Sequence, residues 1–267
     1  MTPSMAQMAA LSLNRARVAP EKDPFAVRVV LADGAQTTVH VRVLDAERTE
    51  TRLVVLRRPE PLAAWCARSG VEDAIVGGFF VRQPVCLPLG EVRTRGVKRR
   101  SVPFLAPWDA VRSCVHVEAG DLRVARRAEL LARPRGDVLQ AGPLLVDDGL
   151  IVVRDGEDPE GFSSGEGGQF DSDITVGRHP RAALGVGDGG LVLVAVDGRS
   201  ADDAGLTLGE LGELMCLLGA RRALNLDGGG STSLVSAGRL VNRPREAHGV
   251  EVAGGRPVVT ALAFSSR

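Results

Sequence analysis

The chain has 267 residues, 44% of them hydrophobic and 25% charged, with 33 basic side chains against 33 acidic ones. This composition is typical of a globular enzyme, and the length suffices for one large domain with a full core. A formal net charge of zero excludes the long-range attraction that nucleic-acid-binding and membrane-surface proteins use, so we expect no nucleic-acid partner. No window approaches 18 apolar residues, and Asn14, Arg15 and Arg17 interrupt any signal-peptide core, which predicts a cytoplasmic protein without membrane insertion.

The N-terminal part is predicted to be a tail followed by a hairpin. Residues 1–23 show little periodicity and are expected to be disordered, so the folded domain is expected over 24–267. The runs 26–31 and 37–43 flank an Asp-Gly turn, and the second run alternates polar with apolar residues. This pattern predicts an antiparallel hairpin in a strand-rich region that extends over 24–73.

Short apolar runs separated by turn residues continue through the middle of the chain, together with one short helix. The helix is predicted at 62–69 and the strands at 52–56, 74–76, 114–117, 122–124, 144–146 and 150–153, the last four as two hairpins. The basic run 93–100 is expected to be a solvated hairpin, although it could also face a phosphate. The glycine-rich, acidic segment 155–170 is not expected to form a core and is predicted to be a mobile loop or an active-site lid.

A strand, a helix and a second strand are predicted in the last third of the chain. The continuous apolar run 191–196 predicts a strand buried on both faces. Thr207 and Glu210 have the spacing of a capping box, and apolar residues at intervals of three and four carry a helix from there to Gly219. A strand at 223–226 follows. The crossover implies that both strands run in the same direction, adjacent or not, so that their carboxyl ends meet at one edge of the sheet.

The chain closes with a predicted hairpin at 234–241 and a final strand at 258–264. Together these elements predict an α+β fold. Its main part is a strand-rich mixed sheet with antiparallel hairpins and a C-terminal βαβ crossover that packs a helix.

The sequence Asn-Leu-Asp-Gly-Gly-Gly-Ser at 225–231 joins one carboxylate to three residues without side chains. Successive glycines let backbone N–H groups turn inward as an anion-binding nest, although a plain tight turn is the alternative. The Asp-Gly pairs at 197–198 and 227–228 both follow strands expected to run the same way, and open α/β sheets place ligands at that edge. The two carboxylates could also hold a divalent cation, Ca or Mg, because hard cations prefer clustered oxygens. A strand-end turn is the alternative for Asp197.

Several motifs resemble the phosphodiester glycosidase family, and they occur in the family's order. They are Gly-Gly-Phe-Phe at 77–80, Pro-Leu-Gly-Glu at 88–91, Gln-Ala-Gly-Pro at 140–143, His-Pro-Arg-Ala-Ala-Leu-Gly at 179–185, Asp-Gly-Arg at 197–199 and Ala-Leu-Asn-Leu-Asp-Gly-Gly-Gly-Ser at 223–231. The resemblance covers 74–264, and the last motif is the specific one. It implies a hydrolase acting on a small-molecule or glycan phosphodiester: the glycosidic bond of a sugar-1-phosphodiester breaks, releasing free sugar and a phosphomonoester.

The implied chemistry assigns roles to three residues. The phosphate leaving group is a weak base, so neutralising its charge matters more than protonating it. Arg181 is the first candidate for this task, because a guanidinium can bind phosphate with two parallel hydrogen bonds. His179 could assist as a donor or an acid, or be an ordinary loop histidine. Asp227 is predicted to be a nucleophile, a general base or the stabiliser of an oxocarbenium-like centre.

The predicted catalytic residues are therefore Asp227, Arg181 and His179. The predicted substrate-binding residues are Gly77, Gly78, Asp197, Gly198, Asn225, Gly228, Gly229, Gly230, Ser231 and Arg256.

The chain departs from the family at Val76, where an asparagine usually precedes the Gly-Gly-aromatic motif. The missing amide leaves open a different substrate, reduced activity, or a non-catalytic carbohydrate- or phosphate-binding protein derived from the family. Val76 could also simply end a buried strand. A P-loop is disfavoured because 228–233 has no lysine before a Ser or Thr, and a serine hydrolase because Ser231 is not in a Gly-x-Ser-x-Gly elbow.

Overall fold

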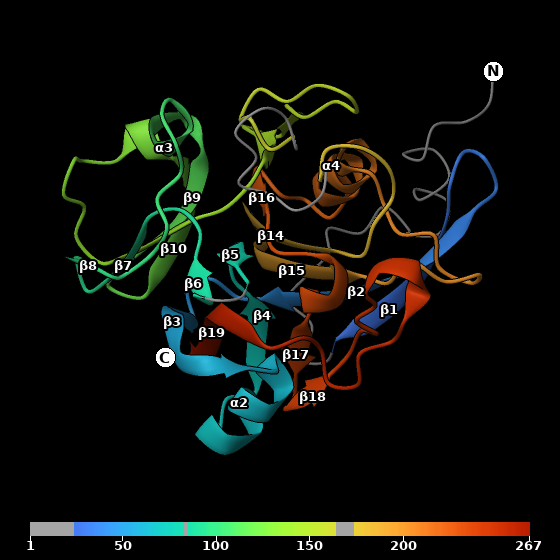
Figure 1. The fold of residues 1–267 in the computed structure, drawn as a ribbon, viewed down its shortest axis with the longest axis horizontal. Coiled ribbons are helices and arrows are strands. Elements are labelled where there is room, and N and C mark those ends of the chain that lie inside the picture. The colour runs from blue at the N-terminus through green and yellow to red at the C-terminus, as the bar shows by residue number, and fades with distance from the viewer. Residues whose placement is uncertain (1–23, 83–84, 164–173) are drawn as a thin grey trace.

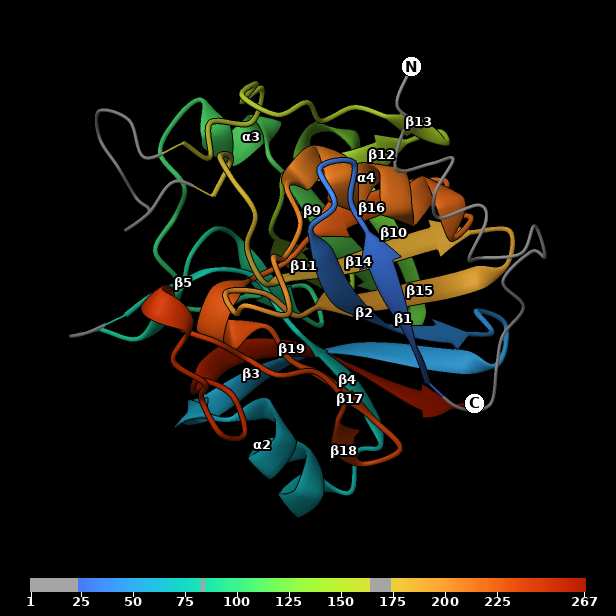
Figure 2. The same ribbon diagram turned by 90° about the vertical axis from the view of Figure 1, so that its right-hand side faces the viewer.

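The computed structural model describes residues 24–82, 85–163 and 174–267. The chain forms two stacked β-sheets with one helix on the outer side of each, and a third sheet lies beside them (Figures 1 and 2). This arrangement confirms the predicted α+β class. The predicted tail at 1–23 lies outside the described residues. Within the described ranges, no helix is long and apolar enough to cross a membrane.

The seven-stranded sheet has the order β1-β2-β15-β14-β16-β12-β13, and each neighbouring pair is antiparallel. Its strands are β1 (Phe25–Val30), β2 (Gln36–Leu44), β12 (Leu144–Asp147), β13 (Leu150–Ile151), β14 (Arg181–Gly187), β15 (Gly190–Val196) and β16 (Arg222–Asn225). The predicted crossover is confirmed in its direction, because β15 and β16 run the same way. However, β14 lies between them and pairs with both. The carboxyl ends of β15 and β16 therefore share one edge of the sheet.

Helix α4 (Leu208–Leu217) covers the outer face of this sheet (Figure 2). The predicted capping box is present, because the Thr207 hydroxyl accepts from the Glu210 amide and the Glu210 carboxylate accepts from the Thr207 amide. Gly219 follows the helix with φ +86°, a left-handed conformation that glycine adopts without strain. The leucines of α4 pack on the valines of β15, while the leucines of β15 face the opposite core. This strand is thus buried on both faces, as predicted.

The five-stranded sheet β18-β17-β4-β19-β3 packs against the inner face of the first sheet. Its strands are β3 (Thr49–Glu60), β4 (Asp73–Val76), β17 (Leu234–Ser236), β18 (Arg239–Leu240) and β19 (Val258–Ser266). Helix α2 (Leu62–Ser69) has the predicted bounds and lies on the outer side of this sheet (Figure 2). Its Leu62 and Cys66 are fully buried, which anchors the helix to the sheet.

The third sheet, β10-β9-β11-β7-β8, lies at the left of Figure 1. Its strands are β7 (Val92–Thr94), β8 (Val97–Lys98), β9 (Ser113–Glu118), β10 (Asp121–Arg126) and β11 (Asp137–Gln140). The remaining elements are β5 (Phe80–Val81), β6 (Leu87–Pro88), α3 (Trp108–Val111), η1 (Arg127–Glu129), η2 (Gly229–Ser231) and η3 (Ala247–Gly249). Val92, Val115 and Leu139 join this sheet to the core between the other two, so all three sheets share one hydrophobic interior.

The glycine-rich segment predicted at 155–170 is packed where the structure describes it. Phe162 is fully buried against two other phenylalanines. The buried Glu160 carboxylate accepts the amides of Ser113 and Leu144. The expectation that this segment contributes nothing to a core is wrong for these residues. The Phe162 ring packs in a hydrophobic cluster and the Glu160 carboxylate binds two buried amides, although glycines surround both residues. The remainder of the predicted lid, residues 164–170, lies outside the described residues.

The basic run 93–100 forms the expected hairpin, β7 and β8, whereas β14 had no strand prediction. Alanine and glycine are weak strand formers, and β14 contains both. Gly185 has no side chain because α4 packs closely on this strand: a Cβ on Gly185 would lie 2.7 Å from the Met215 methyl carbon of α4. The glycine in β14 is therefore explained by the packing of α4 on the sheet, which the local sequence does not reveal.

Candidate active site

The glycine loop at 228–230 directly follows β16 and lies against two other strand ends. Asp227 donates its amide to the carbonyl of Gly77 at 3.0 Å, just beyond the end of β4. The Gly229 amide donates to the carbonyl of Pro180 at 3.0 Å, just before the start of β14. The Gly-Gly, His-Pro-Arg and Asp-Gly-Gly-Gly motifs are therefore brought together in space, although up to about 150 residues separate them in the sequence.

Each glycine of this loop lies where a side chain has no room. A Cβ on Gly228 would lie 2.8 Å from the Pro180 carbonyl oxygen, and one on Gly230 would lie 2.7 Å from the Glu246 carboxylate. Gly229 has φ +61°, and a Cβ there would lie 2.9 Å from a guanidinium nitrogen of Arg199. The glycines therefore allow charged side chains to approach the backbone closely.

The three glycine amides do not form the expected anion nest. The Gly228 amide donates to Oδ1 of Asp227 at 2.9 Å. The Gly229 amide is used by Pro180, as described above. Two of the three donors thus serve the fold of the loop, so an anion at this site would be bound mainly by side chains.

Asp227 has one buried carboxylate oxygen, Oδ2, that has no hydrogen-bond partner in the described part of the chain. Burial raises the pKa of Asp227 from 3.8 to about 6. The Ser231 hydroxyl, the charge of Arg256, the Gly228 amide and the charge of Arg82 each counteract part of this rise. The carboxyl group therefore titrates near neutral pH, and its open oxygen can accept a proton or contact a ligand.

Arg256, which lies just before β19, contacts the same loop. Its amide donates to the Gly230 carbonyl at 2.9 Å, and its Nη1 lies 3.4 Å from the Ser231 hydroxyl oxygen. Glu246 holds the guanidinium at two points, with Nε donating to Oε1 at 2.5 Å and Nη2 donating to Oε2. The hydrogen bond from Arg256 lowers the pKa of Glu246, so both partners stay charged. This ion pair holds Arg256 beside Ser231, where its charge acts on Asp227.

Arg199 is a second cation beside the loop, and it forms no ion pair with the described carboxylates. Its Nη1 donates to the carbonyl of Arg245 at 3.3 Å, and its Nη2 lies 3.5 Å from Nδ1 of His179. Burial lowers the pKa of Arg199, and the charges of Arg256 and Arg82 lower it further, against an opposing effect of Glu246. A half-buried guanidinium without a carboxylate partner attracts an anion.

Arg181 starts β14 next to the loop, and its Cα would lie 4.0 Å from a Cβ on Gly228. Its guanidinium is buried and donates to the carbonyls of Leu206 at 3.1 Å, Ile174 at 2.9 Å and Gly177 at 3.3 Å. Arg181 and Asp227 therefore occupy the same edge of the sheet. Three of the five donors of Arg181 are directed to backbone oxygens, so its part in binding phosphate stays a prediction.

His179 lies between Arg199 and the backbone. Its Nε2 is 3.0 Å from the carbonyl of Val176, and its own backbone pairs with Leu206 in both directions. If Nε2 carries the hydrogen, Nδ1 can accept from Arg199. The geometry thus links His179 to the arginine rather than to Asp227, and its role as an acid stays a prediction.

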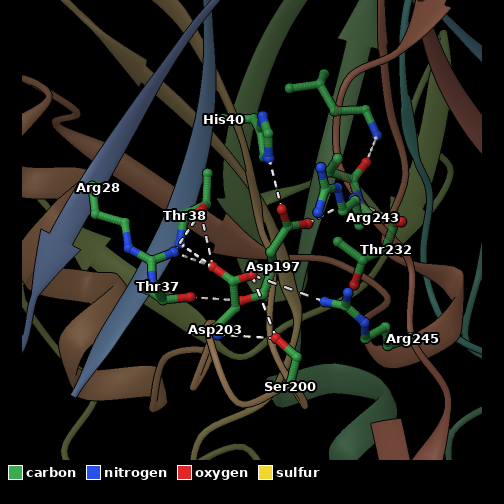
Figure 3. Close-up of polar contacts among 12 residues, drawn as sticks. Arg28, Thr37, Thr38, His40, Asp197, Ser200, Asp203, Thr232, Arg243 and Arg245 are labelled. Atoms are coloured by element: carbon green, nitrogen blue, oxygen red, sulfur yellow. Dashed lines mark hydrogen bonds and ion pairs between the residues drawn. The ribbon is translucent and has the colours of Figure 1, made fainter. Parts of the chain in front are cut away.

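Asp197 belongs to a polar network that includes His40, Asp203 and Arg243 (Figure 3). Its Oδ2 lies 2.9 Å from Nε2 of His40 and its Oδ1 accepts the Arg243 amide at 2.6 Å. Thr37 donates to its carbonyl at 2.7 Å. Asp203, in the same network, accepts from the Thr38 amide and hydroxyl at 2.8 Å, so the loop after β15 is fastened to β2. The carboxylate of Asp197 therefore holds the turn from which Arg199 projects.

The pair Asp197 and Asp227 does not form the cation site considered from the sequence. Both oxygens of Asp197 are bonded as described, and the described residues contain no group of three or more His, Cys, Asp or Glu side chains able to hold a metal. Ca²⁺ and Mg²⁺ require several clustered oxygens, and both carboxylate oxygens of Asp197 are already used by His40 and the Arg243 amide.

The remaining predicted residues shape the wall of the site. A Cβ on Gly77 would lie 2.4 Å from the Thr260 hydroxyl, and one on Gly78 would lie 2.8 Å from the Gln140 carbonyl. A Cβ on Gly198 would lie 2.9 Å from the Pro180 nitrogen and 3.0 Å from the Gly205 Cα. Asn225 is buried, and its side-chain Nδ2 donates to the carbonyls of Gly142 at 2.8 Å and Leu226 at 3.0 Å. These residues set the backbone geometry, and Val76 is fully buried at the end of β4.

Sequence reasoning missed Arg82, Arg199 and Glu246 as members of this site. Arg199 belongs to the Asp-Gly-Arg motif, so its motif was noticed but its side chain was not assigned a role. Arg82 follows the Gly-Gly-Phe-Phe motif by two residues. Glu246 had no sequence signal, because only its contact with Arg256 marks it.

Comparison with known proteins identifies the family. A family model described as phosphodiester glycosidase matches residues 69–265. The SPbeta prophage-derived uncharacterized protein YomE of Bacillus subtilis (strain 168) is 38% identical over 95 residues, which cover 35% of this chain and 14% of that protein. The N-acetylglucosamine-1-phosphodiester alpha-N-acetylglucosaminidase of Bos taurus is 33% identical over 103 residues, which cover 38% of this chain and 19% of that enzyme. The chain thus matches less than a fifth of either relative's length.

The fold has a counterpart among solved structures. The zebrafish N-acetylglucosamine-1-phosphodiester alpha-N-acetylglucosaminidase catalytic domain, auto-inhibited by its pro-peptide, superimposes with a TM-score of 0.65 at 17% identity. The match covers 94% of this chain and 87% of that one, so the fold is shared over nearly the whole domain.

Proposed function

The chain belongs to the phosphodiester glycosidase family, and on that premise we propose that it is a hydrolase of sugar-1-phosphodiesters that releases free sugar and a phosphomonoester. In this reaction the bond between the anomeric carbon and the phosphate oxygen breaks. Its electron pair stays on the phosphate, water supplies the hydroxyl of the free sugar, and the remaining proton leaves to the phosphate or to solvent. The protein must therefore stabilise positive charge at the anomeric carbon and negative charge on the phosphate.

Asp227 is the group we assign to the anomeric carbon. Its Oδ2 has no partner in the described residues, and burial keeps water from screening its charge. Above a pH of about 6 the carboxylate is ionised, so it can act as a nucleophile, activate water or stabilise an oxocarbenium-like centre. All three roles need the same ionised oxygen at the same place.

Arg199 is the group we assign first to the phosphate, with Arg256 beside it. Arg256 is held by Glu246, whereas Arg199 has no carboxylate partner in the described ranges, so a bound phosphate would provide the missing counter-charge. The charge of Arg82 reaches the same residues. This assignment replaces Arg181 as the first candidate because the Arg181 guanidinium is directed to three carbonyls.

One observation carries the proposal: a buried carboxylate oxygen without a hydrogen-bond partner in the described chain lies on a glycine loop contacted by Arg199 and Arg256. A purely structural turn would leave neither an open carboxylate nor an uncompensated guanidinium at such a place.

The test is turnover of a synthetic glycosyl-1-phosphodiester panel, with free sugar as the readout. We expect Asp227→Asn to lower kcat by about 10²–10⁴-fold, the range typical of a positioned proton-transfer group. Asp188→Asn, which changes an exposed turn between β14 and β15, serves as the matched control and should retain full activity. Undiminished turnover by a folded Asp227→Asn variant would remove Asp227 from the mechanism.

A second candidate is a non-catalytic binding protein for carbohydrate phosphodiesters. Val76 favours it, because a buried valine replaces the asparagine that usually precedes the Gly-Gly-aromatic motif. Calorimetric binding of the same panel without release of sugar supports this candidate and contradicts the hydrolase.

A further inference from the structure

The third sheet and its loops carry an excess of positive charge. Residues 91–137, which we call the basic lobe, contain eleven Lys and Arg against six Asp and Glu. The rest of the chain contains 22 Lys and Arg against 27 Asp and Glu, so a net charge of zero hides an excess of five positive charges in one lobe. A local excess of this kind attracts anions irrespective of the net charge.

Most acidic side chains of the basic lobe are already occupied. Asp137 accepts the amides of Leu53 and Arg95 at 3.1 and 2.7 Å. Others form ion pairs, some of them with arginines from outside the lobe: Glu91–Arg93, Glu91–Arg127, Asp121–Arg267 and Glu129–Arg222. These carboxylates therefore cannot neutralise the basic side chains that remain.

Six exposed basic side chains of the lobe take part in no ion pair within the described residues. They are Arg95, Lys98, Arg99, Arg100, Arg133 and Arg135, which we call the basic surface. They come from two adjacent segments, since the Gly96 amide donates to the Gly136 carbonyl at 2.5 Å and a Cβ on Gly96 would lie 4.0 Å from the Arg135 Cα. Such crowding of like charges is unfavourable unless a counter-charge binds.

The basic surface is connected to the candidate active site by consecutive backbone pairs. The Leu89 amide donates to the carbonyl of Phe79 at 2.8 Å, next to the Gly-Gly motif. The Gly90 amide donates to Val102 at 2.7 Å, and Arg100 lies two residues before Val102. From there the chain reaches the hairpin tip within five residues, a span of at most about 17 Å. A polymer of several phosphodiester repeats is long enough to cover a span of this size.

We propose that the basic surface binds the continuing chain of a polymeric substrate whose repeats are joined by phosphodiesters. This inference rests on the proposed function and names its substrate class. One phosphodiester of the polymer occupies the site at Asp227, and the following phosphates lie along the basic surface. Arginine is suited to such a row, because each guanidinium presents several donors to phosphate oxygens.

The test is binding of long-chain polyphosphate by the full chain, followed by fluorescence anisotropy, with pyrophosphate, duplex DNA and anionic phospholipid vesicles as comparison ligands. The variant R95E/K98E/R99E reverses the charge of three basic residues at the hairpin tip. The control R57E/R58E/R239E makes the same charge change at exposed arginines of β3 and β18 that form no ion pair in the described ranges.

We expect the tip variant to lose at least tenfold in affinity for polyphosphate and the control to stay within about twofold. Each phosphate contact in a flexible polyanion contributes roughly 0.7 to the slope of log affinity against log salt, so the slope should fall by about 2 in the tip variant. Hydrolysis of a small glycosyl phosphodiester by the tip variant should stay unchanged.

Equal affinity of the tip variant and the wild type, or an equal loss in the control, overturns the proposal. Tighter binding of duplex DNA or of vesicles than of polyphosphate overturns it as well, because the surface then serves another partner. If the wild type binds polyphosphate through the tip but hydrolyses no small phosphodiester, the proposed function fails and the polyanion surface stands, so the two failures are distinguishable.

Discussion

At the scale of a single residue, Asp227 is the group to which we assign the chemistry. Its pKa of about 6 places the change from acid to carboxylate within the range in which enzymes are assayed. Because the proposed roles all use the ionised form, we expect kcat/KM on a glycosyl phosphodiester to rise with pH through about 6 and then level. A pH-rate profile measures this. An activity that instead falls through pH 6 means that the protonated acid is the working form.

The raised pKa of Asp227 also predicts how the stability of the folded protein depends on pH. A carboxyl group whose folded pKa lies above its unfolded value costs stability once it ionises. The cost is absent below pH 4, grows between pH 4 and 6, and is complete above pH 6. Asp227→Asn should therefore stabilise the fold at pH 7.5 by up to about 3 kcal/mol and leave it unchanged at pH 3.5. Urea denaturation at both pH values checks this, and a variant less stable at pH 7.5 contradicts the burial argument.

Arg199 should act through the phosphate. We expect Arg199→Ala to lower kcat/KM by about 10–100-fold, because one charge-assisted contact contributes about 1.5–3 kcal/mol. Arg199→Lys should recover part of this loss, since it keeps the charge but not the planar fork. Steady-state kinetics with the exposed Arg239→Ala as control measures the difference. Equal activity of all three variants would remove Arg199 from the site.

At the scale of elements, buried polar contacts position the loops of the candidate site. The turn that carries Arg199 is fastened through Asp197 to His40 on β2, and the segment before β14 is fastened through Arg181 to three carbonyls. Both carboxylate and guanidinium were candidates for direct contact with substrate. Their observed contacts show that both side chains hold backbone next to the candidate site, and direct contact with substrate stays a prediction for each of them.

The contribution of the α4 capping box to the stability of the protein can be tested by substitution of Thr207. Its capping box satisfies two amides of the first turn, so Thr207→Ala should cost about 1 kcal/mol and lower the Tm by roughly 2–4 °C. Thr207→Ser keeps the hydroxyl and should melt with the wild type. Thermal denaturation followed by circular dichroism compares the three proteins, and an unchanged Tm for Thr207→Ala contradicts the contribution of the cap.

At the scale of the whole molecule, the sheets depend on strands that precede the family match. The match begins at residue 69, yet β2 pairs with β15 and β3 pairs with β19. We expect a fragment that starts at residue 69 to be unfolded, because it exposes one edge of each main sheet and the core that β2 and β3 cover. Chain 24–267 should unfold in one cooperative transition. A folded fragment, seen by circular dichroism and a sharp melt, contradicts this dependence.

Local patterns determined much of the fold. The capping box of α4, the bounds of α2, the doubly buried β15 and the hairpin of β1 and β2 each depend on residues close together in the sequence, so their spacing alone predicts them. The direction of β16 relative to β15 follows from chain geometry. The insertion of β14 between them does not, since it depends on the fit of Gly185 against α4.

The candidate site divides in the same way. The sequence by itself determined that a carboxylate and three glycines follow a buried strand, and that the surrounding motifs belong together. Only the tertiary structure decided that Arg199 and Glu246 lie against the glycine loop and that the charge of Arg82 reaches Asp227. It also decided that two of the three glycine amides bond to Asp227 and Pro180, and that Asp197 and Arg181 contact backbone. The physical reason is that charge, burial and hydrogen-bond partners are properties of neighbours in space, which the fold brings together from distant parts of the chain.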